Sequence, residues 1–200
     1  SKTSCKQVIY LSGIINELKL SKRLLSRKTV EEELGKGSYA LTCLRAGIII
    51  GSGSASFEIM RDLVEKLPVM ITPKWLRTKC QPIGIRDVQR FLIESVLNEK
   101  TFDKNFDIGC KDILSYKEML LELAAVRNLK RKIWIVPVMT PRLSSYWLYF
   151  VTSTSFKLAR SLVESMKIEV ICRNDDLNIL LNIEPISYRQ ALINAFDRIE

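Results

Sequence analysis

The sequence predicts an α/β fold built on a parallel sheet, followed by a mostly helical second part. Two apolar runs typical of β-strands, residues 8–11 and 41–50, flank a segment with helical spacing, and such a unit requires parallel strands. The unbroken run GIII in the second strand is typical of a strand covered on both faces. With 200 residues, 47% of them hydrophobic, the chain can fill one core of ordinary size, or one core and a smaller satellite.

The first strand is predicted to end at Ser12 and Gly13. A helix is predicted after it because apolar residues fall close to helical spacing, and glycines 35 and 37 would end it. These apolar residues are Leu20, Leu24, Leu25, Val30 and Leu34. The second strand ends at Gly51 and opens into a loop rich in glycine and serine. We interpret this loop as either a permissive turn or a ligand-facing segment.

A second helix is predicted from one apolar stripe, which consists of Phe57, Met60, Leu63, Val64 and Leu67. It should stop at Pro68, and an irregular stretch with three prolines follows over residues 68–82. A third helix is predicted from Val88, Phe91, Leu92 and Val96, which repeat at the spacing of a core-facing helix. The pair Arg86-Asp87 is expected to cap that helix.

Alternating elements continue to the end of the chain. Further strands are predicted at residues 102–109 and 132–138. Capping signals mark three further helix starts: Ser115 with Glu118, Ser187 with Gln190, and Thr140 with Pro141.

The composition excludes several classes of chemistry. The chain contains no histidine, which removes His-based metal sites, Ser-His-Asp triads and Cys-His dyads. Its five cysteines are odd in number and never spaced as CxxC, which argues against a disulfide framework and a zinc site, so no metal is expected. No apolar run reaches the length of about 18 residues that a membrane span needs, and the N-terminal residues resemble no leader peptide. We therefore expect a cytoplasmic protein without a membrane partner.

The formal net charge is +9, but the basic residues are spread over three separate places. These clusters lie at 19–28, 74–79 and 127–132, with little aromatic interleaving and no nucleic-acid-binding signature. Nucleic acid is therefore an unlikely partner. The basic residues are either solvated helix ends and loops, or part of a pocket for an anionic ligand such as a nucleotide phosphate.

The order of several short stretches resembles the later half of an extended or atypical short-chain dehydrogenase/reductase. These stretches are YLSG, SRKTVEEEL, LTCLRAGIIIGSG, QPIGIRDVQRFL, FDIG and SYKEM. Within that superfamily the chain is most similar to nucleoside-diphosphate-sugar epimerases and to NmrA-like or complex-I-subunit-like NAD(P)-binding proteins. The resemblance implies a partial Rossmann-like parallel sheet. Residues 1–110 would form the later half of an NAD(P)-binding domain, with a substrate-side insertion at about 54–81. Residues 111–200 would form a mostly helical substrate-side lobe.

The resemblance also implies site residues. Ser12 matches the family's catalytic hydroxyl, and Lys28 matches the lysine that bonds the nicotinamide ribose and lowers the pKa of a catalytic tyrosine. The tyrosine should stand four residues before the lysine, but Leu24 occupies that position and cannot transfer a proton. By the same resemblance, the backbone of Ala46, Gly47 and Ile48 passes the nicotinamide. The substrate would meet the loop through Gly51, Ser52, Ser54 and Ser56. The alternative is that Ser12 is an ordinary strand-end hydroxyl and Lys28 a solvated cation.

The implied function is that of an NAD- or NADP-dependent oxidoreductase or nucleoside-diphosphate-sugar epimerase, with a small molecule such as a nucleotide sugar as substrate. The family's phosphate-binding turn, G-x-x-G-x-x-G, does not occur in these 200 residues. This departure and the missing tyrosine keep open a non-catalytic NAD(P)-binding sensor or assembly protein. The family's first strands also have no counterpart here. A half sheet would expose an apolar edge, through which we expect a homo-oligomer to form.

Overall fold

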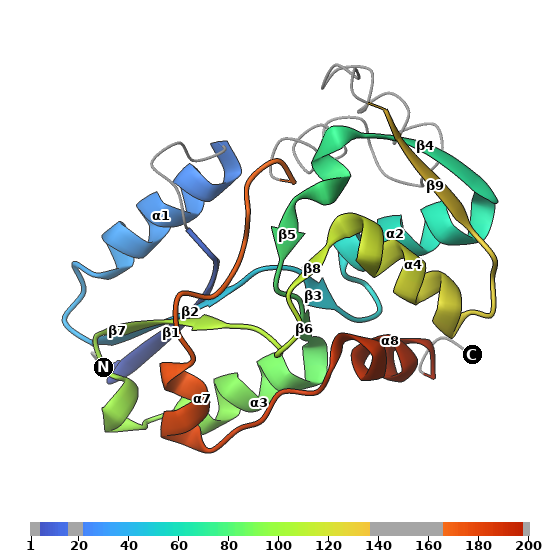
Figure 1. The fold of residues 1–200 in the computed structure, drawn as a ribbon. Coiled ribbons are helices and arrows are strands. Elements are labelled where there is room, and N and C mark those ends of the chain that lie inside the picture. The colour runs from blue at the N-terminus through green and yellow to red at the C-terminus, as the bar shows by residue number, and fades with distance from the viewer. Residues whose placement is uncertain (1–4, 16–21, 137–165, 198–200) are drawn as a thin grey trace.

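The computed structural model describes residues 5–15, 22–136 and 166–197. Its main sheet has three parallel strands in the order β1 (Gln7–Gly13), β2 (Ala40–Ala46) and β7 (Lys104–Ile108). Helix α1 (Lys22–Leu34) lies on one side of this sheet, and α3 (Ile85–Ser95) and α7 (Asp176–Leu181) lie on the other (Figure 1). The predicted parallel α/β arrangement is therefore confirmed. Within the described residues β1 pairs with β2 alone, and assembly through its free edge stays a prediction.

The second predicted strand is in fact two strands. β2 ends at Ala46, and β3 (Ile49–Ile50) belongs to a separate parallel pair with β6 (Ile83–Gly84). The break lies at Gly47, where a Cβ atom would stand 3.0 Å from the backbone oxygen of Gln81. The chain changes sheets at this close approach. A continuous apolar run cannot reveal such a break, because the residues on both sides of it are buried.

The predicted helix after the first strand forms as α1, but two of the apolar residues that marked it are exposed. Leu25 and Val30 are 54% and 41% exposed. Among residues 25–34 only Arg27, Glu31 and Leu34 are partly buried. The predicted helix is therefore confirmed, and among residues 25–34 two of its three partly buried side chains are charged.

The proline-containing stretch at 68–82 is ordered rather than irregular. After helix α2 (Ala55–Lys66), strand β4 (Val69–Pro73) pairs in parallel with β9 (Lys132–Val136). A 3-10 turn, η1 (Lys74–Arg77), leads to β5 (Lys79–Cys80), which pairs antiparallel with β8 (Leu114–Ser115). Pro73 does not prevent this because, within the described residues, β4 pairs with β9 alone, and proline is tolerated on such an edge strand.

Of the three predicted helix starts, two lie within the described residues, and one of these forms a complete capping box. In α4 (Tyr116–Val126) the capping box of Ser115 and Glu118 is confirmed in both directions. In α8 (Tyr188–Phe196) the Ser187 hydroxyl accepts the Gln190 N–H, whereas the Gln190 side chain bonds Asn194 instead of completing a box. The helix predicted at Thr140 and Pro141 lies outside the described residues.

The predicted cap of α3 is wrong. Its N-cap is Gly84, which supplies no side-chain bond, and Asp87 lies inside the first turn. The Asp87 carboxylate instead accepts the backbone N–H of Ile186 at 3.1 Å, and so ties α3 to the segment that precedes α8.

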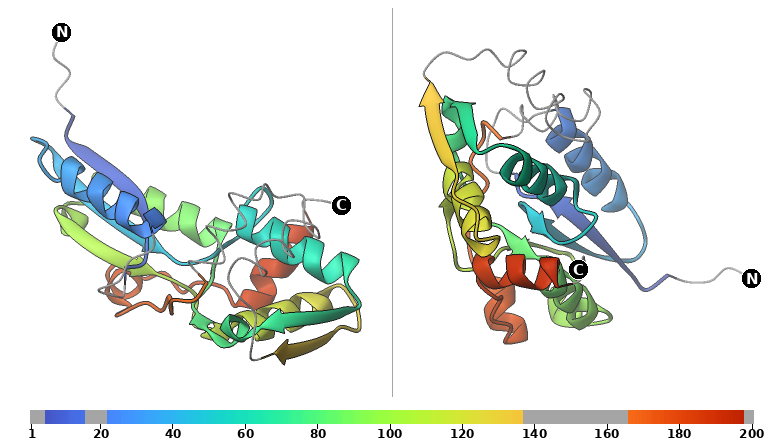
Figure 2. Two further views of the ribbon diagram at one scale, coloured as in Figure 1. Left: turned by 90° about the horizontal axis from the view of Figure 1, so that it is seen from above. Right: turned by 90° about the vertical axis from the view of Figure 1, so that its right-hand side faces the viewer.

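Two apolar clusters lie on either side of the break at Gly47. One joins the main sheet to α3 and α7, and the other joins α2, α4 and α8 to the β4–β9 pair (Figures 1 and 2). The buried stripe predicted for α2 belongs to the second cluster, where Phe57 meets Phe196 edge to face at 5.5 Å.

The division of the chain at residue 110 stays a prediction. α7, from the second predicted part, packs on β7. Among the described residues no helix is long and apolar enough to span a bilayer.

Candidate functional site

The parallel strands end together at one edge of the main sheet, where ligands bind in open α/β sheets. Ser12 is in register with Arg45, in the last pair but one of β1 and β2, so it stands at this edge. The Ser12 side chain is 1% exposed, and its Oγ has no hydrogen-bond partner within the described residues. A buried hydroxyl without a partner carries a penalty of about 1–3 kcal/mol. A ligand oxygen that reached this hydroxyl would remove the penalty.

The structure does not bring Lys28 to Ser12. The Lys28 side chain is 51% exposed on α1, and its Nζ lies 3.8 Å from the carboxylate of Glu32, one helical turn later. The Ser12 hydroxyl makes no bond to it, since it has no partner among the described residues. The pairing of these two residues as a catalytic set therefore stays a prediction.

A partly buried ion pair that sequence reasoning missed lies beside Ser12. The guanidinium of Arg45, the β2 residue in register with Ser12, bonds the carboxylate of Glu31 on α1. Both side chains are largely buried. This pair ties α1 to the sheet. Glu31 follows Lys28 by three residues, so the pair also fixes the part of α1 that carries Lys28.

The three residues predicted to pass the nicotinamide lie in packed protein. Ala46 and Ile48 are buried, and Gly47 faces the backbone of Gln81 and the side chain of Val170. A Cβ atom at position 47 would stand 3.1 Å from Val170 Cγ1. This stretch therefore acts as a crossing point between chain segments in the structure, and its role toward a cofactor stays a prediction.

The residues of the loop predicted to meet the substrate lie in different surroundings. Gly51 and Ser52 line a cavity of about 220 Å³ that α3 and α8 complete. The Ser54 hydroxyl points back into the fold and donates to the Ile49 oxygen at 2.7 Å. Ser56 is partly exposed in the first turn of α2. Gly53 has a φ of +82°, a conformation that favours glycine, so the loop's turn depends on that residue.

The end of β7 is held by a second buried charge. The Asp107 side chain is 1% exposed, and its carboxylate accepts from Arg173 Nε at 2.7 Å and Nη2 at 2.8 Å. The backbone N–H of Arg173 donates to the same carboxylate at 3.1 Å. These hydrogen bonds raise the pKa of the Arg173 guanidinium. They fix the segment that precedes α7 against the carboxyl end of β7.

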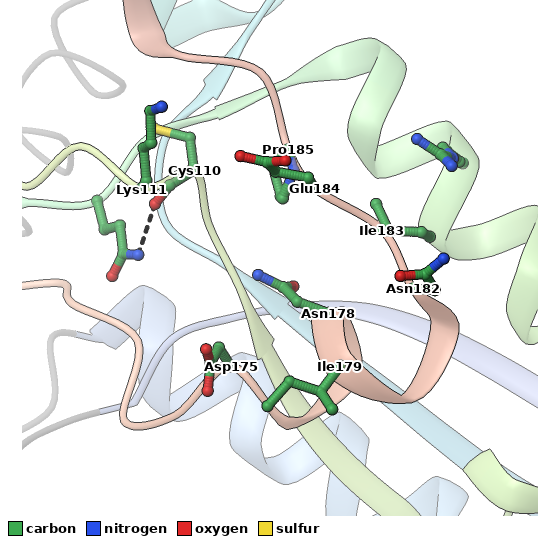
Figure 3. A pocket seen from close by; sticks show the side chains of 11 residues that line it. Cys110, Lys111, Asp175, Asn178, Ile179, Asn182, Ile183, Glu184 and Pro185 are labelled. Carbon is green, nitrogen blue, oxygen red and sulfur yellow. Dashed lines mark hydrogen bonds between the residues drawn. The ribbon is translucent and has the colours of Figure 1, made fainter.

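A cavity of about 610 Å³ opens just beyond β7, and Figure 3 shows its lining. The Asn178 carboxamide lies in its middle, with Lys111 and Asp175 to one side and Asn182 to the other (Figure 3). The Asn178 Oδ1 is buried and has no partner among the described residues. Burial raises the pKa of the nearby Cys110 thiol to about 11, so this group stays protonated at neutral pH. The cavity can therefore bind a polar ligand by hydrogen bonds.

Sequence reasoning missed this cavity because its residues come from four separate parts of the chain. Gln81 follows β5, Arg90 lies on α3, and Cys110 and Lys111 follow β7. The other lining residues belong to residues 175–185, that is, to the N-cap of α7, to α7 itself and to the segment after it. A single apolar or charged pattern therefore does not mark the cavity in the sequence. The cavity forms only because α7 packs against β7, and the sequence does not show this contact.

No protein family model matches the sequence, and no curated protein matches it. Solved structures with a similar fold include three enzymes. A nucleoside-diphosphate-sugar epimerase from Staphylococcus aureus has 14% identity and a TM-score of 0.68, over 93% of this chain and 64% of that one. UDP-glucuronic acid 4-epimerase from Bacillus cereus, in complex with NAD, has 13% identity and a TM-score of 0.66, over 96% and 60%. An NADPH-dependent quinone oxidoreductase from Escherichia coli, complexed with NADPH, has 13% identity and a TM-score of 0.71, over 96% and 66%.

These likenesses confirm the Rossmann-like fold that the sequence resemblance implied. The similar proteins are epimerases and reductases, in agreement with that resemblance. The chain spans between 60% and 66% of the length of these three structures.

Proposed function

We propose that the chain acts as an NAD(P)-dependent epimerase or reductase of the atypical short-chain type, with Ser12 bonding the reacting oxygen of its substrate. The observation that supports this proposal is the buried Ser12 hydroxyl at the carboxyl edge of the sheet, which has no hydrogen-bond partner among residues 5–15, 22–136 and 166–197. The fold likeness to enzymes of this class supports it further. By the same likeness the substrate is a small molecule, with a nucleotide sugar as the first candidate.

The described residues fit one half of such a site. NAD or NADP would supply the hydride acceptor or donor, and the Ser12 hydroxyl can donate to a carbonyl or alkoxide oxygen beside it. The acid–base half fits less well, because Leu24 stands where the family has a tyrosine and the Lys28 side chain is half exposed on α1 and makes no bond to Ser12 among the described residues. Proton transfer is therefore not assigned to either of these two residues.

The second candidate is a protein that binds NAD(P) without turnover, as a sensor or assembly partner. The leucine at position 24 favours it, because a hydride transfer that cannot exchange a proton with the substrate oxygen is slow. Both candidates share the cofactor and the fold, and they differ in turnover alone.

One experiment separates these candidates. The protein is titrated with NADH and with NADPH while the fluorescence of Trp75, Trp134 and Trp147 is followed, and turnover is then assayed over a panel of sugar nucleotides and quinones. Saturable binding with turnover that Ser12→Ala lowers about a hundredfold supports the enzyme. Saturable binding without turnover supports the sensor. Absence of binding to either nucleotide contradicts both.

A further inference from the structure

The β4–β9 pair has one buried and one exposed face. On β4, Met70 and Thr72 point inward and are 0% and 1% exposed. On the opposite face, Val69, Ile71 and Trp134 are 45%, 51% and 61% exposed. Ile71 pairs directly with Trp134 in the register, so the three side chains form one continuous apolar strip. Exposed apolar patches of this kind mark contact surfaces.

Cations border this strip on two sides. Lys132 is in register with Val69 at one end. Beside Trp134 a cavity of about 510 Å³ is lined by Arg77, Lys79 and Lys117. One carboxylate, that of Glu118, also lines the cavity, so three cations against one anion leave a net charge of +2. The Glu118 carboxylate is already engaged, because it accepts from the backbone N–H of Ser115 at 2.6 Å and from its hydroxyl at 2.7 Å.

We propose that this strip docks onto an anionic phospholipid surface, with a lipid phosphate in the cavity. Tryptophan is enriched where protein meets the membrane–water interface, because its ring is apolar and its N–H is polar. Lysine and arginine near such a surface are attracted to anionic headgroups. The strip thus places an indole and two aliphatic side chains at the interface, while the cations of the cavity face the headgroups.

The side chains of the apolar strip favour a lipid over a single-stranded nucleic acid as its partner. Nucleic-acid sites of that kind stack successive bases on several aromatic side chains. Here Trp134 is the one aromatic residue of the strip, and its neighbours Ile71 and Val69 offer no ring for stacking. Aliphatic side chains do gain from burial among lipid headgroups and acyl chains.

This docking site is independent of the proposed enzymatic site. The β4–β9 pair lies at the far side of the molecule from the β1–β2–β7 sheet (Figures 1 and 2). It would hold the protein at the membrane surface without crossing the bilayer. The sequence had suggested no membrane partner, because the apolar strip is assembled from two strands and neither has a long apolar run.

The test is co-sedimentation of the full chain with vesicles of phosphatidylglycerol mixed with phosphatidylcholine, compared with vesicles of phosphatidylcholine alone. We expect binding to the anionic vesicles that weakens with added salt. Lys79→Gln should weaken this binding about fivefold, since each basic residue near the surface contributes to that extent. Trp134→Ser should weaken it about tenfold. Brominated lipids should quench Trp134 fluorescence in the bound state.

Matched variants away from the strip serve as controls. Lys36→Gln removes an exposed lysine after α1, and Ile179→Ser removes an isoleucine of α7 that is 73% exposed. Neither should change vesicle binding. The proposal is overturned if anionic vesicles are not bound, or if the controls reduce binding as much as the strip variants. It is also overturned if oligothymidylate, and not the vesicles, is bound in a way that depends on Trp134.

Discussion

At the scale of single residues, the Ser12 hydroxyl should contribute to turnover and lower the free energy of unfolding. Because Oγ is buried and has no partner in the part of the chain that the structure describes, Ser12→Ala removes an unsatisfied group. We expect the free energy of unfolding to stay the same or rise by about 1 kcal/mol, while turnover falls. Urea unfolding followed by circular dichroism measures the first quantity.

Ser95 provides the matched control for Ser12. Its Oγ is also buried and unpartnered within the described residues, but it lies at the last position of α3, away from the carboxyl edge of the sheet. Ser95→Ala should change stability in the same direction and leave turnover untouched. A clear loss of stability in Ser12→Ala would mean that the hydroxyl serves the fold instead.

The ion pair of Asp107 and Arg173 should contribute more to stability than an exposed pair does. In Arg173→Ala the Asp107 carboxylate keeps its burial and loses two charge-assisted hydrogen bonds, so we expect a loss of about 2–3 kcal/mol. Arg189→Ala breaks an exposed pair with Glu122 and should cost less than about 1 kcal/mol. Equal losses in chemical denaturation would contradict this ranking.

At the scale of elements, the capping box of α4 makes stability depend on pH. Hydrogen bonds from the Ser115 side chain and backbone lower the pKa of the Glu118 carboxyl, and the charge of Lys79 adds to this. A carboxyl whose pKa is lowered in the folded state stabilises above its unfolded pKa, and this contribution is lost as the pH falls through the folded pKa. Ser115→Ala should therefore cost about 1 kcal/mol at neutral pH, and less in acid.

The start of α8 is the control for this pH dependence. Ser187→Ala removes the same kind of N-cap bond, but the third helical residue there is Gln190, which does not titrate. Its cost should be similar at neutral pH and independent of pH. Thermal unfolding of both variants between acid and neutral pH measures the difference. Parallel pH profiles for the two variants would contradict the role given to Glu118.

The same elements show why some of the fold could be predicted from the sequence. α2 and α4 were recognisable because one buries an apolar stripe and the other begins with a capping box, both of which are local signals. The break at Gly47 depends on Gln81 and Val170, which are distant in sequence. The ion pair that joins Glu31 of α1 to Arg45 of β2 likewise links two residues of different elements, and no local pattern marks it.

The candidate site divides in the same way. The place of Ser12 at the sheet edge was predictable, because the carboxyl ends of parallel strands meet at one edge, while its role there stays a prediction. The cavity beside Lys111 was not, because it exists only where α7 meets the end of β7. Long-range contacts of this kind leave no periodic pattern in either segment.

At the scale of the whole molecule, the two apolar clusters should unfold as one unit. The chain crosses between them at several points that are bonded to one another: Cys110 N–H donates to the Pro82 oxygen at 2.7 Å, and Gln81 N–H to the Val170 oxygen at 2.8 Å. A Cβ atom at Gly109 would stand 2.8 Å from Cys172 Sγ, so these segments are in tight contact. Loss of one cluster would leave these crossing segments without support.

A substitution that destabilises one cluster should therefore also shift the unfolding transition of the other. Leu177 is fully buried in the sheet cluster, and Leu177→Ala should cost about 2–5 kcal/mol. Trp75 packs in the other cluster, and its fluorescence can be isolated by Trp134→Phe and Trp147→Phe. If the molecule unfolds cooperatively, the Trp75 transition in urea moves by the same amount as the loss of helix signal. A Trp75 transition that stays in place while the helix signal shifts would show that the α2, α4 and α8 cluster folds independently of the sheet.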